Sequence, residues 1–275
     1  MFGGCFALND AYRKLRSSSM ASSMECAFVG SLAGLAVLII VSGFDFQVTP
    51  FTLLIAMLSA LVSIGFTVCS FKALDSTNLS LYSLFSMLGG MLLPFFQGII
   101  FYSEKITLAK IVCVIFICAS LCLTVSRDRN KNGTKYYIGI FVLNGVVGVL
   151  SKAFTSAPFE KTNAEWYSIW SAFFTAVFSG GVWLLVSRKG NLPKYTFKAF
   201  AVSAVSGAIN KIANFLLLIA LLHIAASIQY PMVTGGVIII STLISFWGKR
   251  KPSKKELLSV FTAFLGLLAL LLIDA

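Results

Sequence analysis

Charged residues and the usual catalytic residues are scarce in this sequence. Only 12% of the 275 residues are charged, whereas about a quarter of a soluble domain usually is. There is one histidine, His223, and no GxxxxGK[ST] phosphate-binding loop. These shortages argue against a His-based metal centre, ATP-driven chemistry and an enzyme, and we expect neither a metal nor another cofactor.

The cysteines give no sign of a disulfide or metal framework. The sequence has six, and none forms a CxxC pair: Cys5, Cys26, Cys69, Cys113, Cys118 and Cys122. Most lie within apolar runs, so we expect them to pack as small hydrophobic side chains.

Long apolar runs fill most of the chain. Hydrophobic residues make up 58% of it, and the mean hydropathy is +0.90. A membrane-spanning helix needs about 20 mostly apolar residues. By that measure the sequence predicts spans at residues 25–44, 51–74, 79–101, 107–126, 136–155, 165–187, 199–224, 227–248 and 255–273. Residues 1–15 are apolar up to Ala11 and are interpreted as the second half of a further helix. The prediction is an all-α membrane protein of ten helices, the first one short.

The spacing of two glycine pairs predicts an internal repeat. Gly89-Gly90 and Gly235-Gly236 are 146 residues apart. A shift of that length also aligns Phe101 with Trp247, Lys105 with Lys251, and Thr107 with Ser253. Thr107 and Ser253 both stand where the N-cap of the next helix is expected.

We therefore predict two domains, residues 1–126 and 136–275, each a repeat of five helices. Because five is an odd number, the second repeat enters the membrane in the opposite orientation. Inverted repeats are typical of secondary transporters, whose substrate site lies at the repeat interface near the bilayer midplane.

The final helices carry a family resemblance. Residues Gln229-Tyr-Pro-Met-Val-Thr-Gly-Gly-Val-Ile-Ile-Ile-Ser241 are followed by Lys251-Pro-Ser253 and a terminal apolar helix. The first repeat closes similarly, with Gly89-Gly90, Pro94 and Ser103-Glu-Lys-Ile-Thr107. In these residues the chain resembles EamA-like proteins, a family of the drug/metabolite transporter superfamily. The resemblance extends over the chain through its five-plus-five plan and implies transport, but it says little about the substrate.

The chain departs from that family at two loops. EamA-like proteins often have Gly-Glu before the fifth and tenth helices, whereas this chain has Ser103-Glu104 and Lys249-Arg250. The expected function is secondary transport of a small metabolite, such as an amino acid or organic acid, by alternating access. The alternatives are a lipid or headgroup flippase and a non-transporting membrane subunit.

Location and partners follow from the same features. We expect a multi-pass protein of the cell membrane, in the cytoplasmic membrane of a bacterium. In such a protein the net charge of +12 reflects orientation rather than nucleic-acid binding, because Lys and Arg collect in cytoplasmic loops. The expected partners are a small-molecule substrate and membrane lipids, with the chain a monomer or homodimer.

Lys211 is the sharpest candidate for substrate binding. It lies near the centre of the predicted span 199–224, where a lysine costs about 2.5–3.5 kcal/mol on the insertion scale. Asn210 and Asn214 share one helical face beside it. This group predicts a cationic site for a carboxylate or phosphate. The alternative is a structural lysine paired with a carbonyl or with an acid such as Asp10.

Other polar residues within the spans are weaker candidates. Those expected to line a substrate cavity are Asn144, Tyr82, Ser86, Gln97, Gln229, Tyr230 and Thr234. Asp10 is the one carboxylate well inside a predicted span and is a candidate for ion coupling, although Arg13 and Lys14 lie one turn away to pair with it.

Glycine and proline residues predict close packing and hinges. Gly89, Gly90, Gly235 and Gly236 would let helix backbones approach closely in lipid. Pro94 is expected to kink its helix, and Pro231 to loosen the start of the next-to-last one.

Overall fold

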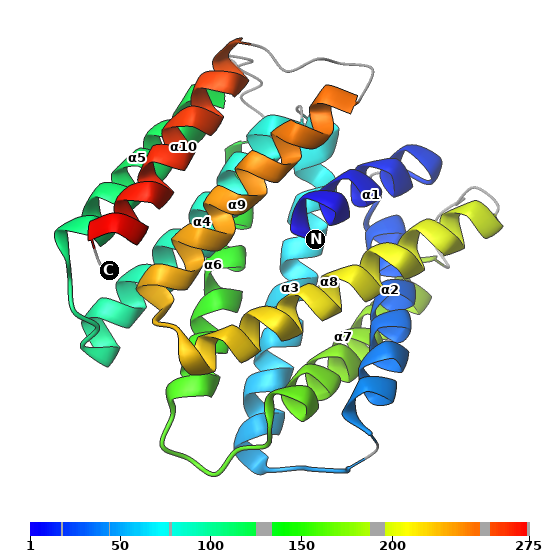
Figure 1. The fold of residues 1–275 in the computed structure, drawn as a ribbon. Coiled ribbons are helices and arrows are strands. Elements are labelled where there is room, and N and C mark those ends of the chain that lie inside the picture. The colour runs from blue at the N-terminus through cyan, green and yellow to red at the C-terminus, as the bar shows by residue number, and fades with distance from the viewer. Residues whose placement is uncertain are drawn as a thin grey trace.

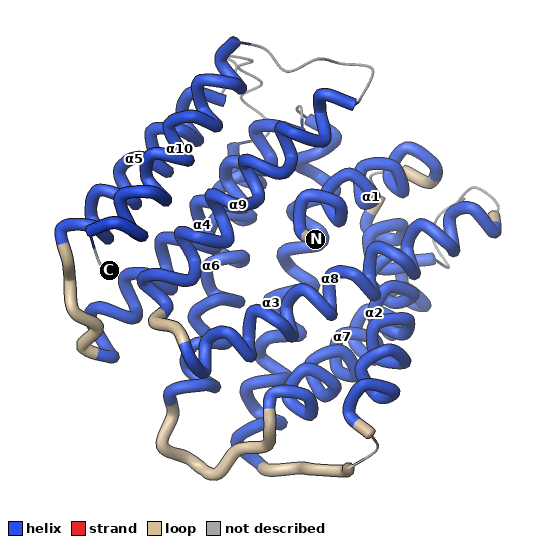
Figure 2. The backbone as a smooth tube through the Cα atoms, in the orientation of Figure 1, coloured by secondary structure: helices blue, strands red, loops and turns tan. Residues whose placement is uncertain are grey.

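The computed structural model describes residues 1–17, 19–43, 45–76, 79–124, 134–187, 196–247 and 254–273. Within these residues the chain forms ten helices joined by loops, and no strand (Figures 1 and 2). The helices are α1 (Phe2–Leu15), α2 (Met20–Ser42), α3 (Pro50–Ser76), α4 (Leu79–Tyr102), α5 (Leu108–Thr124), α6 (Thr134–Ser156), α7 (Ala164–Ser187), α8 (Phe197–His223), α9 (Ala226–Trp247) and α10 (Lys254–Ile273).

Each helix expected from the sequence is present, and six of them are long and apolar enough to cross a membrane. The six segments are Met20–Ser42, Pro50–Ala73, Phe85–Tyr102, Lys135–Ser156, Ala164–Ser187 and Phe197–His223. Leu108–Ser120 and Leu257–Ala269 are shorter apolar helices. The all-helical fold is therefore confirmed, and the chain is a multi-pass membrane protein.

Hydroxyl side chains set several helix starts. Helix α2 begins five residues before the predicted span because the Ser19 side chain accepts a hydrogen bond from the Ser22 backbone N–H at 3.2 Å. Helix α2 ends at Gly43, whose φ of 66° suits glycine. Thr107 caps α5 as predicted, accepting from the Lys110 N–H at 3.3 Å. The matching cap, Ser253, lies outside the described residues.

Nine of the ten described helices fall into three groups across the bundle. Helices α5 and α10 pack side by side at one edge, where Figure 1 shows them at the left. Helices α4, α6 and α9 occupy the middle, and α2, α3, α7 and α8 form the other side. The most extensive contacts are those of α4 with α6, α2 with α7, α5 with α10, and α2 with α8.

The packing partners recur along the chain. Helix α2 packs on α8, and α7, five helices later, packs on α3. In the same way α3 packs on α6 and α8 on α1, while α4 packs on α6 and α9 on α1. Helix α2 also meets α7, its own counterpart, as α4 meets α9 and α5 meets α10.

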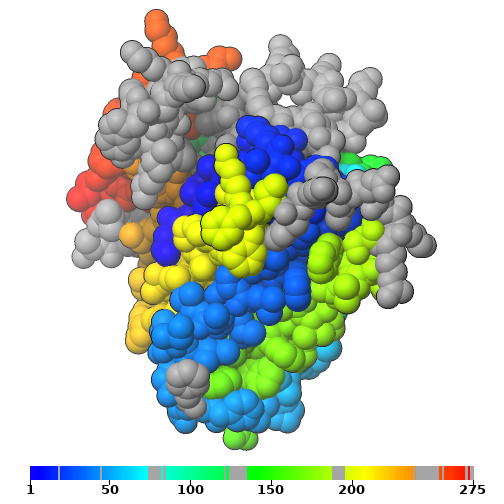
Figure 3. All heavy atoms as spheres, turned by 90° about the vertical axis from the view of Figure 1, so that its right-hand side faces the viewer, coloured from blue at the N-terminus to red at the C-terminus, as the bar shows by residue number. Residues whose placement is uncertain are grey.

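The bundle carries apolar residues outside and many polar ones inside. Large side chains such as Phe101, Phe197 and Leu185 are exposed to 76%, 84% and 68%. Figure 3 shows the face where α1, α8, α2 and α7 meet. Fully buried hydroxyl residues include Ser22, Ser23, Ser86, Ser120, Ser179, Ser227 and Ser259. An apolar exterior suits lipid as the surrounding solvent. The helical backbone suits it too, because each helix satisfies its backbone hydrogen bonds internally.

Candidate functional site

A cavity of about 240 Å³ lies within the bundle. Helices α1–α4 and α6–α9 line it, whereas α5 and α10 contribute none of its described lining. About half of the lining residues carry a hydroxyl or an amide, and the remainder are mostly phenylalanine, glycine and aliphatic residues. A cavity with polar groups, inside a bundle with an apolar exterior, is the kind of place where polar or charged side chains are found within a membrane protein.

Helix α8 supplies the charge of this cavity. Lys211 lies on the cavity wall with Asn210 and Asn214, as predicted. The Asn214 amide donates to the Asn210 carbonyl at 2.8 Å and to its side-chain oxygen at 3.1 Å. Among the described residues, no hydrogen bond or ion pair joins Lys211 to another group. Within the structural alternative, a pair between Lys211 and Asp10 is therefore excluded, because Asp10 pairs with Arg13 and Lys14.

Small residues of α2 hold Lys211 in place. At the crossing of α2 and α8, a Cβ on Gly30 would lie 3.0 Å from the Cα of Gly207. One turn further, a Cβ on Gly34 would lie only 2.5 Å from Cγ of Lys211. Gly30 and Gly34 form a GxxxG pair, the spacing that permits close helix crossing in lipid. The aliphatic part of Lys211 thus lies directly against the backbone of α2.

The opposite wall comes from α4, α6 and α9. The Asn144 amide donates to the Ser86 carbonyl at 2.7 Å and to its hydroxyl at 3.3 Å. The Tyr230 hydroxyl donates to the Gly148 carbonyl at 3.1 Å. Thr234 lies one turn further along α9. The structure therefore brings Asn144, Ser86, Tyr230 and Thr234 to the same cavity as Lys211.

Three residues predicted to line the cavity lie elsewhere. Tyr82 is fully buried, and its hydroxyl donates to Ser70 at 3.3 Å. Gln97 borders a separate apolar pocket nearer the end of α4. The Gln229 amide donates to the Leu217 carbonyl at 2.6 Å, which fixes it between α8 and α9. Each prediction failed because hydropathy places a residue along a helix without giving the side that it faces.

Asp10 does not reach the cavity either. Its carboxylate pairs with Arg13 at 2.9 Å and with Lys14 at 2.6 Å, both within α1. These are the two local partners that the sequence offered as the alternative to a role of Asp10 in ion coupling. Asn9, the preceding residue, does line the cavity, and its side-chain oxygen accepts from Ser206 at 2.8 Å.

The predicted packing glycines differ in their surroundings. A Cβ on Gly89 would collide with the backbone of Phe141, so α4 and α6 touch there. Gly90 lines the cavity beside Asn144, and Gly235 faces Leu267 of α10. Gly236 has open space around its Cα. Pro94 and Pro231 both lie within continuous helices.

A stripe of hydroxyl side chains on α3 also lines the cavity and was not predicted from the sequence. Ser59, Ser63 and Thr67 recur every four residues and all line the cavity. Ser59 also shares a hydrogen bond of 2.7 Å with the Tyr167 hydroxyl of α7. The four-residue spacing of polar side chains within an apolar helix was the available signal.

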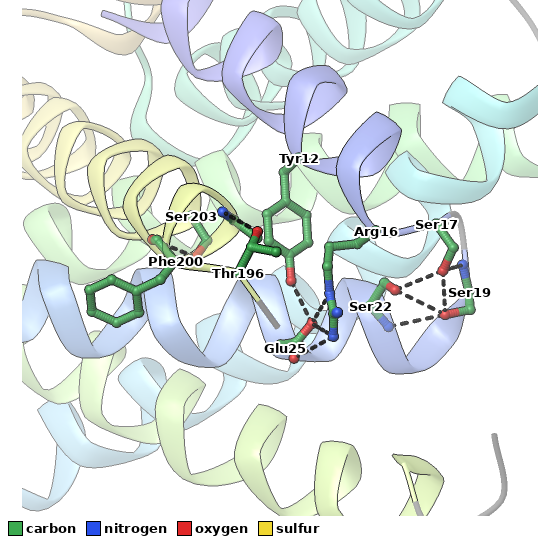
Figure 4. Close-up of polar contacts among 10 residues, drawn as sticks. Tyr12, Arg16, Ser17, Ser19, Ser22, Glu25, Thr196, Phe200 and Ser203 are labelled. Atoms are coloured by element: carbon green, nitrogen blue, oxygen red, sulfur yellow. Dashed lines mark hydrogen bonds and ion pairs between the residues drawn. The ribbon is translucent and has the colours of Figure 1, made fainter. Parts of the chain in front are cut away.

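A buried carboxylate, Glu25, ties α1 to α2. Two N–H groups of Arg16 donate to its two oxygens at 2.8 Å, and the Tyr12 hydroxyl donates at 2.7 Å (Figure 4). Beside this pair, Ser17, Ser19 and Ser22 exchange hydroxyl hydrogen bonds. Glu25 lies inside α2, so Asp10 is not the one carboxylate within a helix.

A second buried pair joins the α4–α5 loop to α6 and α9. Glu104 Oε1 lies 2.9 Å from Lys152 Nζ, and the carboxylate also accepts from the backbone N–H groups of Ala226 and Ser227 at 3.0 and 2.9 Å. Glu104 thus caps α9 from the other half of the chain. Burial opposes its charge, but the hydrogen bonds from Ser227 and Lys152 outweigh burial and lower the pKa of this carboxyl.

Comparison with known proteins identifies the fold alone. No protein-family model matches the sequence, and no curated protein matches it significantly. A solved crystal structure, whose description names no function, superimposes with a TM-score of 0.75 and 16% identity. The match covers 98% of this chain and 92% of that chain. The fold is a known one. At that identity the likeness shows the fold and no function.

Proposed function

We propose that this chain is a secondary transporter that moves a small polar metabolite across a cell membrane by alternating access. The observation that carries the proposal is the polar cavity between the helices of residues 1–126 and those of 136–275, inside a bundle with an apolar exterior. A structural subunit has no use for such a cavity.

The recurring packing partners support an inverted repeat. The most extensive pairings of the five helices of 1–126 with the rest of the chain recur in the five helices of 136–275. Transporters with this symmetry place the solute at the interface between repeats and expose it to each side in turn by rocking one repeat on the other. Of the residues that carry the EamA-like resemblance, Gly90, Tyr230 and Thr234 lie on the cavity wall. Membership of that family is part of the proposal.

The test asks whether the cavity is reached from both sides of a membrane. Ser63 lines the cavity from α3, so Ser63→Cys places a thiol there. The variant is reconstituted in vesicles and treated with a small, membrane-impermeant methanethiosulfonate, either outside or trapped inside. Wild-type protein, with its own cysteines, gives the background labelling.

Alternating access predicts that the thiol introduced by Ser63→Cys reacts from both sides, and that a bound solute slows both reactions. Labelling from one side only would contradict the proposal and favour a receptor or subunit. Protection by lipids, and by none of the water-soluble metabolites, would favour a flippase.

A further inference from the structure

The charges on the cavity wall are unequal. Among the described lining residues Lys211 is charged and none is aspartate or glutamate. A buried cation is costly unless it is paired, and a second cation beside it would be repelled. The cavity therefore offers a place for a negative group and no negative partner for an ammonium group.

Three acids among the described residues are already paired with cations. Asp10 pairs with Arg13 and Lys14, Glu25 with Arg16, and Glu104 with Lys152. Moving the carboxylate of Glu25 or Glu104 to Lys211 would leave another buried cation unpaired, which gains nothing. The counter-ion of Lys211 has to enter with the solute.

Uncharged groups around the cavity match hydroxyls. The side-chain oxygen of Asn9 accepts from Ser206, which leaves its amide as a donor. The amides of Asn144 and Asn214 are used as donors, which leaves their oxygens as acceptors. A hydroxyl both donates and accepts, so it bonds to either kind of group.

The size of the cavity limits the solute. At 240 Å³ the cavity is somewhat smaller than the usual ligand pocket of about 300–1,000 Å³. That volume suits a small metabolite better than a nucleotide or a disaccharide.

We infer that the solute is a small hydroxylated monoanion, whose carboxylate or similar group binds the ammonium of Lys211 and whose hydroxyls bind Asn9, Asn144 and Asn214. This inference rests on the proposed transport function and narrows its substrate class. The inference excludes cations as solutes. It also predicts that zwitterionic amino acids bind much more weakly than anions of the same size.

Gly34 determines where that ammonium lies. Because a Cβ at this position would overlap Cγ of Lys211, Gly34→Ala displaces the lysine stem while keeping its charge. Gly181 of α7 has nothing within 4 Å of its would-be Cβ, so Gly181→Ala is a matched control. Gly34 is a positioning residue, and the prediction is that anion binding falls in the first variant and not in the second.

The experiment compares solutes that differ in one group. Glycerate, L-serine and glycerol have three carbons each. Serine replaces one hydroxyl of glycerate with an ammonium, and glycerol replaces its carboxylate with a hydroxymethyl group. Glycerol 3-phosphate adds a second negative charge, and acetate, lactate and gluconate vary the size. Binding to the purified full chain is measured by ligand-induced thermal stabilisation and calorimetry.

Glycerate is expected to bind at least about tenfold more tightly than glycerol, which lacks the carboxylate that makes a charge-assisted hydrogen bond with Lys211. It should also bind at least about tenfold more tightly than serine, whose ammonium meets the cation of Lys211 and no negative partner in the described lining. Lys211→Met removes the preference, and Lys211→Arg retains part of it. The inference is overturned if serine or glycerol binds as well as glycerate, if Lys211→Met binds anions unchanged, or if no monocarboxylate binds.

These results separate the inference from the proposed function. A neutral or zwitterionic solute that protects the Ser63→Cys thiol from both sides would overturn the anion assignment and leave transport in place. An anion that binds at Lys211 without two-sided accessibility of that thiol would contradict transport and leave the anion site in place. If glycerol 3-phosphate stabilised the protein more than glycerate does, the inference that the solute carries a single negative charge would be wrong.

Discussion

The buried charges differ between the ends of the bundle and its middle. At one end Arg16 and Glu25 form a two-bonded ion pair, and at the other Glu104 pairs with Lys152 and caps α9. In the middle, Lys211 faces the cavity without a partner among the described residues. The same kind of side chain therefore has opposite consequences for folding. The pairs at the ends hold helices together, and the lysine in the middle is kept despite its cost.

Helices α3 and α8, which both line the cavity, also differ in the charge that they bring to it. Helices α3 and α8 have 27 residues each, and the shift of 146 residues that aligns the glycine pairs brings Lys211 onto Gly65. Helix α3 contributes hydroxyls to the cavity, whereas α8 contributes a charge and two amides. A repeat fixes where helices cross, and the residues that have diverged between the copies determine what the cavity binds.

Removing the acid of the first pair is expected to have the largest effect. Glu25→Gln leaves the buried guanidinium of Arg16 without its counter-charge, which costs about 3–5 kcal/mol in a buried site. Reversible unfolding in detergent, followed by helical circular dichroism, measures the loss. Glu160→Gln, at an exposed loop position, is the control. Equal stability of the two variants would show that the Arg16–Glu25 pair does not hold α1 to α2.

Glu104→Gln likewise leaves the buried ammonium of Lys152 without its counter-charge, and the expected cost is about 3 kcal/mol, at the lower end of the same range, because the amide oxygen still accepts from one backbone N–H of α9. The pair also predicts a pH dependence. Since the pKa of Glu104 is lowered in the folded protein, its stabilisation is complete above the ordinary value of 4.5 and is lost as pH falls below it. The wild type should lose stability in this range more steeply than the Gln variant. Parallel curves would contradict the assignment.

The order of the helices along the chain was predictable from the sequence. Which side of each helix faces the cavity was not. Apolar runs located each helix, because a segment that crosses lipid has to be mostly apolar. Lys211 was recognisable as a candidate because a charged side chain inside such a run costs free energy. Tyr82, Gln97 and Gln229 looked equally suitable in the sequence. Packing turned them toward Ser70, an apolar pocket and the Leu217 carbonyl instead.

The ion pairs escaped prediction for a different reason. Glu104 and Lys152 lie in different halves, and nothing in their spacing indicates that the α4–α5 loop reaches the start of α9. Glu25 is the first residue of the predicted span 25–44, so the sequence placed it at the end of a helix and not inside one. Hydropathy underestimates a helix whose first turns are polar but buried against Arg16 and Tyr12.

The contact between α2 and Lys211 gives the next smaller effect. Gly34→Ala forces the lysine stem or the helix to move, and overpacking of this kind typically costs about 1–3 kcal/mol. Gly181→Ala, which meets no neighbour, should be neutral or slightly stabilising because alanine favours the helix. The same unfolding measurement compares them. If both variants behave alike, Lys211 is not held by α2, and the middle of the bundle is looser than its ends.

Lys211→Met is expected to have the smallest effect on stability, and of the opposite sign. The substitution keeps the aliphatic volume and removes a charge that has no partner, so stability in the absence of solute should be unchanged or rise by about 1 kcal/mol. Lys152→Met, which strands Glu104, should instead lose about 3–5 kcal/mol in the same unfolding assay. A loss at Lys211 as large as that at Lys152 would mean that Lys211 has a structural partner. The distinction between charges that fold the protein and a charge that awaits a ligand would then fail.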